Sequence, residues 1–238
     1  MSMLIDAYRF ATAPALSLYD EIMSDNPFMY LRLGEASGTN ANNENGATDG
    51  TFSGTHTLGN TALYSGGPTC FRVTGTDGRC AWPGASIPSL TQLTLGVIYK
   101  PSSSSGIRHI FTIDQDSGGS RRFQFRYVGT NLDWIKIVGG VESVPRTNGM
   151  SVGTAYLLNV TITTGGLVKL FVNGSQIGSN ATIGAVDYGG SSATDLVIGN
   201  RGTHNEGQST DEFSEAYAIA TAISDARILA HAQAAGFA

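Results

Sequence analysis

The sequence predicts an all-β fold: an antiparallel sandwich of two sheets with a short helix near each end. Most of the chain is a series of segments in which apolar and polar side chains alternate, separated by glycine-bearing turns. The final segment, 210–238, passes from an alternating strand directly into an Ala-rich amphipathic helix. Charged residues make up only 14% of the chain and there are 31 glycines, which suits many short strands joined by tight turns.

Period-two alternation identifies the expected strands. In the segment 107–113, for example, alternation places Ile107, His109, Phe111 and Ile113 on one face. Asn173-Gly174 is a strong hairpin signal. Short connections favour antiparallel pairing of neighbouring strands. Two such sheets packed face to face form one sandwich, so we expect a single domain over 14–238. The expected strands are 28–33, 93–99, 107–113, 121–128, 133–138, 156–162, 168–172, 195–199 and 212–220.

The regions outside these strands have distinct patterns. Helical spacing over 15–24 ends at Asn26-Pro27, and the C-terminal helix has Ser224 or Asp225 as its N-cap and Gly236 as its end. The Asn-rich loop 34–50 is not expected to build core. Residues 1–13 form an arm that is predicted to order on a partner, the alternative being a frayed terminus. The apolar anchors of this arm are Leu4, Ile5, Tyr8 and Phe10.

Charge and hydropathy exclude several classes of partner. The net charge is −5, the pI is near 5.3, and no run of Lys or Arg exists, which argues against nucleic acid and anionic membranes. No apolar run approaches the roughly 20 residues of a membrane span. The first residues lack a basic region followed by an apolar core, so a secretory signal is not expected.

The two cysteines have two interpretations. Cys70 and Cys80 flank a segment, 71–79, that predicts a hairpin, and a disulfide across it is one interpretation. The other is a pair of small, semi-buried, reduced side chains, which the missing signal favours.

Four stretches together resemble the concanavalin A-like (laminin-G-like) jelly-roll family. They are NPFMYLRLGE at 26–35, DGTF at 49–52, LFVNG at 170–174, and a closing series of IGN at 198–200, DEF at 211–213 and ISDA at 223–226. The resemblance covers about residues 15–238 and implies a two-sheet jelly roll with one concave face. Its opening and closing motifs are distinctive as a pair.

The resemblance further implies the variety of this fold that is common in bacteriophage virions. On that basis we expect a non-enzymatic structural subunit of a capsid decoration, head fibre or tail fibre, made in the bacterial host cytoplasm. Its expected partners are other virion proteins and copies of itself in a homo-oligomer. The family also includes glycan-binding lectins and glucanases, so a module for host surface polysaccharide is the first alternative and a polysaccharide hydrolase the second.

A glycan-binding patch is predicted on two neighbouring strands. If Phe123, Phe125, Ile135 and Ile137 face the core, the intervening side chains face outward together. An exposed indole beside several hydrogen-bond donors suits a sugar ring. The alternative is that the indole packs under a loop or a subunit neighbour. The predicted patch residues are Arg122, Gln124, Arg126, Trp134 and Lys136.

Catalysis is not expected. A retaining glycosidase needs two carboxylates close together, whereas Asp211 and Glu212 are adjacent and would point to opposite faces of a strand. A calcium ion is the one cofactor with a candidate site, because Asp114 and Asp116 lie in a Gly-rich turn. The alternative for that turn is a plain hairpin connection.

Overall fold

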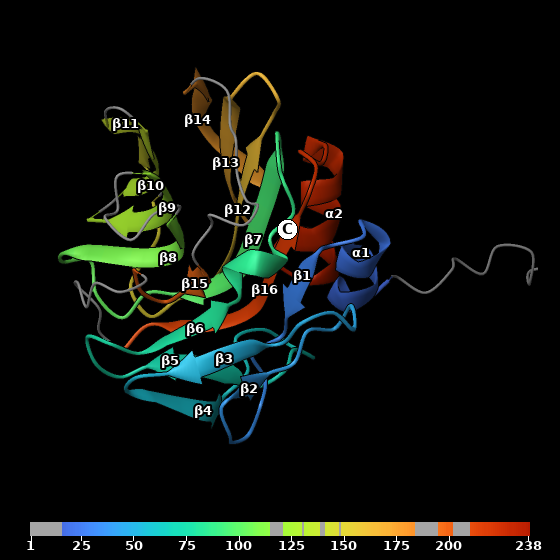
Figure 1. The fold of residues 1–238 in the computed structure, drawn as a ribbon, viewed down its shortest axis with the longest axis vertical. Coiled ribbons are helices and arrows are strands. Elements are labelled where there is room, and N and C mark those ends of the chain that lie inside the picture. The colour runs from blue at the N-terminus through green and yellow to red at the C-terminus, as the bar shows by residue number, and fades with distance from the viewer. Residues whose placement is uncertain are drawn as a thin grey trace, which may run out of the picture.

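The computed structural model describes residues 16–114, 121–129, 131–138, 141–147, 149–183, 195–201 and 210–238, and in them two antiparallel sheets form a sandwich (Figure 1). We call them sheet A and sheet B. In sheet A the order is β14 (Ser175–Thr182), β13 (Leu167–Val172), β12 (Tyr156–Ile162), β7 (Leu93–Lys100), β16 (Glu212–Ile219), β5 (Cys70–Val73) and β4 (His56–Asn60), with β1 (Met29–Leu31) also pairing with β16. In sheet B the order is β11 (Val141–Thr147), β10 (Asn131–Val138), β9 (Arg121–Val128), β8 (Ile107–Asp114), β15 (Leu196–Ile198), β6 (Arg79–Trp82), β3 (Gly50–Ser53) and β2 (Asn40–Ala41).

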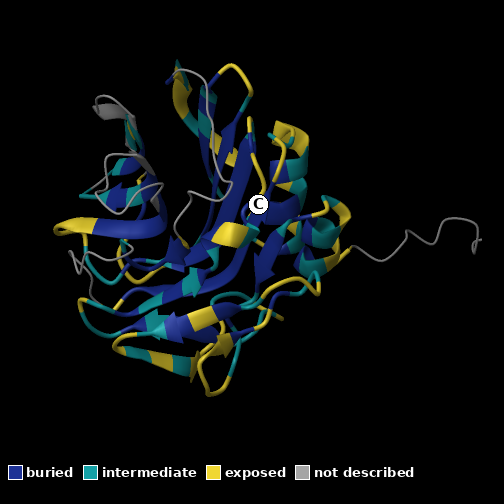
Figure 2. Cartoon of the chain, viewed as in Figure 1, coloured by how far each residue is buried: buried dark blue, intermediate teal, exposed yellow. Residues whose placement is uncertain are grey.

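The main core lies between the inner faces of the two sheets, where the burial is continuous (Figure 2). Val97 and Leu158 contribute from sheet A, and Phe111 and Phe125 from sheet B. All four are exposed by 1% or less. The antiparallel two-sheet sandwich with short terminal helices expected from the sequence is therefore confirmed.

The predicted turn and the predicted caps of the C-terminal helix are also confirmed, and the structure adds a cap for the first helix. Asn173 and Gly174 both have positive φ, 51° and 79°, as a two-residue hairpin turn between β13 and β14 requires. Helix α1 (Leu18–Ser24) begins with a capping box at Ser17. The Ser224 side chain caps helix α2 (Asp225–Ala234), and Gly236, at φ 74°, follows its end. A 3₁₀ turn, η2, covers Gly84–Ser86.

Two sequence expectations are wrong. Residues 70–80 are not a hairpin, because β5 joins sheet A and β6 joins sheet B, and the buried cysteines Cys70 and Cys80 are both unbonded thiols. Burial raises the pKa of the Cys70 thiol to about 12. The loop 34–50 does contribute to the interior: it contains β2, and the buried Asn43 amide accepts the Tyr30 backbone N–H at 2.9 Å. The anchors of the predicted arm, residues 1–13, lie outside the described residues.

Both helices pack on the outer face of sheet A, next to each other (Figure 1). Leu18 and Ile22 of α1 and Ala232 of α2 form a second apolar cluster with residues of the sheet. Arg227 of α2 joins the helices through ion pairs at 2.6 Å to Glu21 and 2.9 Å to Asp25.

A chain of buried hydrogen bonds fastens α2 to sheet A. Asn159 Nδ2 donates to the Tyr217 hydroxyl at 2.5 Å, the hydroxyl lies 2.9 Å from His231 Nδ1, and His231 Nε2 lies 2.8 Å from Asp25 Oδ2. Each donor has an acceptor when the imidazole is neutral with its proton on Nε2. Gly96 makes room for the chain, because a Cβ there would lie 2.1 Å from the Tyr217 ring.

We expect this chain to make folding stability depend on pH. Burial is the largest cause that lowers the pKa of His231 below its ordinary 6.5, against the opposing charge of Asp25 and with Arg227 and Glu21 nearby. The unfolded chain therefore binds the proton first, so the stabilisation is complete above pH 6.5 and decreases as the pH falls toward the folded-state pKa. For one proton the slope cannot exceed about 1.4 kcal/mol per pH unit.

Urea unfolding between pH 8 and pH 5 measures this dependence. The His231→Gln variant should be less stable at pH 8 and should lose less stability between pH 8 and pH 5 than the parent. Parallel curves for the two proteins would show that His231 titrates alike in the folded and unfolded chains.

Candidate functional site

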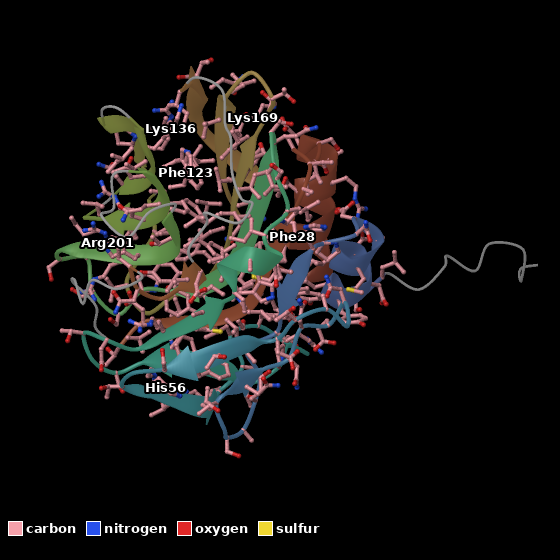
Figure 3. All side chains as sticks on the ribbon, viewed as in Figure 1. Phe28, His56, Phe123, Lys136, Lys169 and Arg201 are labelled. Atoms are coloured by element: carbon pink, nitrogen blue, oxygen red, sulfur yellow. The ribbon has the colours of Figure 1, made fainter. Side chains whose placement is uncertain are left out.

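The predicted glycan patch is divided between the two faces of sheet B. Directly opposed residues of antiparallel strands share a face, and Trp134 opposes Phe125 while Lys136 opposes Phe123. Trp134 is fully buried and stacks on Phe123 with ring centroids 6.2 Å apart. Lys136 Nζ donates to the Ile183 carbonyl at 2.8 Å. Figure 3 shows Phe123 in the space between the two sheets, so the expected outward face for Trp134 and Lys136 is wrong.

The physical reason is that β10 carries apolar side chains on both faces. Leu132 and Trp134 have one parity, and Ile135 and Ile137 have the other. Trp134 offers the larger apolar area, and its parity faces the core, while Ile135 lies buried on the outer side.

Gln124 and Arg126 do lie on the outer face of sheet B. The register also places Arg122 on this side, although its side chain lies outside the described residues. A row crosses four strands here, from β15 to β10: Val197, Thr112, Gln124 and Ile135 are opposed in turn. Two adjacent polar side chains thus lie between two aliphatic ones. We call these four residues the sheet B row.

The polar centre of the sheet B row has unmet hydrogen-bonding capacity. Thr112 is 1% exposed and Gln124 is 2% exposed, yet Thr112 Oγ1 and Gln124 Nε2 have no hydrogen-bond partner among the residues that the structure describes. Buried polar atoms are nearly always paired, because leaving one unpaired costs about 1–3 kcal/mol. Within the described residues, two neighbouring buried polar groups are thus left without a partner.

A second row lies beside the first. His109 opposes Arg126, and Arg126 Nη2 forms a 2.6 Å ion pair with Asp133 Oδ2. The Arg126 Nε atom is a further buried donor for which the described part of the chain supplies no partner. The predicted common face of His109 and Phe111 is wrong, since a bulge between them turns Phe111 into the core. Period-two counting misses Thr112 and Asp133 because it cannot locate that bulge or set the register of β10.

The acidic pair Asp211 and Glu212 is divided, as predicted. Asp211 is buried and accepts the Ser102 backbone N–H at 2.8 Å and the Tyr99 hydroxyl at 3.0 Å. Burial is the main cause that raises its pKa. Glu212 instead accepts from Arg72 and Lys100 on the outer face of sheet A. Burial would raise the pKa of Glu212, but these two cations hold it below its ordinary value.

Two pockets open on the outer face of sheet A. The first has a volume of about 320 Å³ and includes Arg72, Lys100 and Glu212 in its lining. The second has a volume of about 380 Å³ and includes Lys169 and Asp225. Neither pocket was predicted, because their side chains come from strands whose order in the sheet cannot be read from sequence spacing.

Neither a metal centre nor a membrane-crossing helix is found in the part of the chain that the structure describes. There, no three His, Cys, Asp or Glu side chains are placed to hold a metal ion. Asp116 and the side chain of Asp114, the proposed calcium ligands, lie outside the described residues, so that site stays a prediction. No described helix is both long and apolar enough to cross a membrane.

Comparison with known families gives one match over most of the chain. The model of the concanavalin A-like lectin/glucanases superfamily matches residues 74–230. A comparison with curated protein sequences finds no match.

Several solved structures share the fold. Domain 4 of a GH43 extracellular arabinanase from Geobacillus stearothermophilus, in complex with arabinotriose, is 15% identical with a TM-score of 0.66, covering 87% of this chain and 98% of that one. The binding domain of botulinum neurotoxin serotype D is 13% identical with a TM-score of 0.64, covering 90% of this chain and 52% of that one. A Trypanosoma rangeli sialidase is 14% identical with a TM-score of 0.62, covering 86% and 32% respectively. The chain thus spans about half of the toxin domain and a third of the sialidase.

Proposed function

Because this chain belongs to the concanavalin A-like lectin/glucanase superfamily, we propose that it is a carbohydrate-binding domain that recognises a glycan without cleaving it. The observation that carries the proposal is the unpaired, buried Thr112–Gln124 centre of the sheet B row. A sugar hydroxyl both donates and accepts hydrogen bonds. It can therefore accept from Gln124 Nε2 while pairing with Thr112 Oγ1.

The surroundings of these two groups suit a saccharide. Val197 and Ile135 flank the polar pair with buried apolar side chains, and Arg126 is a partly exposed donor beside the row. The structural likeness to an arabinanase domain in complex with arabinotriose supports the class of ligand, because that domain is matched over nearly its full length.

Recognition without hydrolysis is supported by the carboxylates. In the described part of the outer face of sheet B, Asp133 is ion-paired with Arg126. Asp211 and Glu212 lie on opposite faces of sheet A, each held by its own partners. Neither arrangement offers the two facing acids that glycoside hydrolysis needs.

We expect the Gln124→Met variant to lose glycan binding while keeping its stability. Methionine has a similar shape, and it removes a buried amide that makes no hydrogen bond from Nε2, so unfolding should be unchanged or slightly harder. Binding should fall about tenfold or more on a glycan array that includes arabino-oligosaccharides. Gln176→Met, an exposed change on β14, is the matched control.

Two results would overturn the proposal. One is the absence of array binding by the parent protein, and the other is equal binding by the parent and by the folded Gln124→Met variant. Release of reducing sugar from the same glycans would show that the protein hydrolyses its ligand.

Attachment to a bacteriophage particle stays a separate prediction from the sequence resemblance. It depends on the arm at 1–13, which lies outside the described residues. Cross-linking mass spectrometry of purified particles should find lysine-reactive links from this chain to a capsid or tail protein. If this chain is absent from the particles, the structural role in the virion is ruled out.

A further inference from the structure

We propose that the pocket lined by Arg72, Lys100 and Glu212 is a second ligand site, specific for a carboxylate-bearing sugar such as a uronic acid residue. We call it the sheet A pocket. It lies on the opposite sheet from the sheet B row, so its occupation does not depend on the function proposed for that row.

The charge of the sheet A pocket comes from a row across three adjacent strands. Arg72 on β5 opposes Glu212 on β16, and Glu212 opposes Lys100 on β7. Two cations therefore share one carboxylate. Lys100 Nζ lies 2.7 Å from Glu212 Oε2, and Arg72 pairs with Oε1. The trio carries a net charge of +1.

The cations of this trio are accessible, and the anion is not. The side chains of Arg72 and Lys100 are 40% and 35% exposed, while that of Glu212 is only 6% exposed. Arg72 bonds to Glu212 through Nε and Nη2, so within the described residues its Nη1 donors remain for a ligand. The Lys100 ammonium has two N–H groups beyond the one aimed at Glu212. The site thus presents positive charge and open donors to an incoming anion.

The remaining lining suits a sugar ring. Val152 is 47% exposed and gives an apolar wall, and Thr210 adds an exposed hydroxyl-bearing residue. The volume of about 320 Å³ lies at the small end of the range of about 300–1,000 Å³ for ligand pockets, as expected for one sugar residue.

The second pocket on sheet A supplies an internal comparison. Its cation, Lys169 (labelled in Figure 3), lies 2.8 Å from both carboxylate oxygens of Asp225. One cation and one anion leave no net charge, so this pocket has no reason to prefer an acidic sugar. Lys169 is therefore a matched control for Lys100, since both lie on the outer face of sheet A and are paired to a carboxylate.

The test is ligand-observed NMR titration of the full chain with methyl β-D-glucuronide, and with methyl β-D-glucoside as its uncharged counterpart. We expect the parent to bind the glucuronide in preference, with an affinity that falls on adding salt. Lys100→Met should weaken glucuronide binding about tenfold or more, because a charge-assisted hydrogen bond is lost. Lys100→Arg should retain it, and Lys169→Met should leave it unchanged.

Each alternative outcome overturns the proposal. No glucuronide binding by the folded parent, equal binding of glucoside, or an unaffected Lys100→Met variant removes the acidic-sugar site. Competition by acetate at the same concentration as the glucuronide makes this a general anion site and removes the role of the sugar ring. Failure here is distinguishable from failure of the proposed function, because Gln124→Met acts on sheet B and should not alter the glucuronide titration.

Discussion

Among substitutions that replace one side-chain atom by another, Glu215→Gln should reduce the folding stability of this protein most. Glu215 is fully buried and accepts the hydroxyls of Tyr30 and Tyr64, both at 2.6 Å, and the Arg32 guanidinium at 3.0 Å. Burial, then the charge of Glu215, raises the pKa of Tyr30, so that its proton stays in place to donate. Removing one member of a buried ion pair costs about 3–5 kcal/mol. We expect the lower end, because the Arg32 side chain is 32% exposed and water can solvate part of its charge.

The free energy of unfolding in urea measures this loss, and a double-mutant cycle identifies its origin. In an Arg32→Met background, Glu215→Gln should cost less than in the parent, since the guanidinium that would be left unpaired is already absent. Additive effects of the two changes would show that the ion pair is not what makes Glu215 important.

Trp134→Ala should be comparably destabilising, by about 3–5 kcal/mol, because it leaves a large cavity between the sheets. The indole is fully buried and stacked on Phe123. Its Nε1 atom is buried, and no described residue accepts its hydrogen bond. Trp134→Phe should therefore cost less, since it keeps most of the aromatic contact and removes an unpaired donor.

Thermal or urea unfolding distinguishes this core role from the ligand platform that the sequence predicts. The folded Trp134→Phe variant should bind glycans as the parent does. Unchanged stability in Trp134→Ala, together with lost glycan binding, would show that the indole is part of the glycan-binding surface.

The motif pairing at the two ends of the sequence has a structural explanation. Tyr30 and Arg32 belong to the opening motif, and Glu215 lies just after the closing DEF. The β1–β16 ladder brings the two segments together, and the positive φ of Glu215, 52°, accompanies a bulge in the pairing of β16 with β7. Two residues of the opening motif thus contact a buried carboxylate that lies just beyond the DEF of the closing series.

The order of strands limited what the sequence could predict. Alternation found β7 and β12, whose core-facing residues follow a regular period of two. It missed β11, which contains Pro145 and lies at the edge of sheet B, where a proline is tolerated. It also joined β5 and β6 into a hairpin, because a short polar turn looks the same whether a chain returns along one sheet or crosses to the other.

The sequence by itself determined the fold class, the caps of the C-terminal helix and the turn at Asn173-Gly174, since each depends on neighbouring residues and their backbone preferences. Only the tertiary structure decided which residues meet. Thr112 and Gln124 lie on the consecutive strands β8 and β9 and become neighbours through the register of that pair. Lys100, Glu212 and Arg72 come from strands far apart in the chain. A one-residue change in parity moves every side chain of a strand to the other face, which is why Trp134 lies in the core and not on the predicted binding surface.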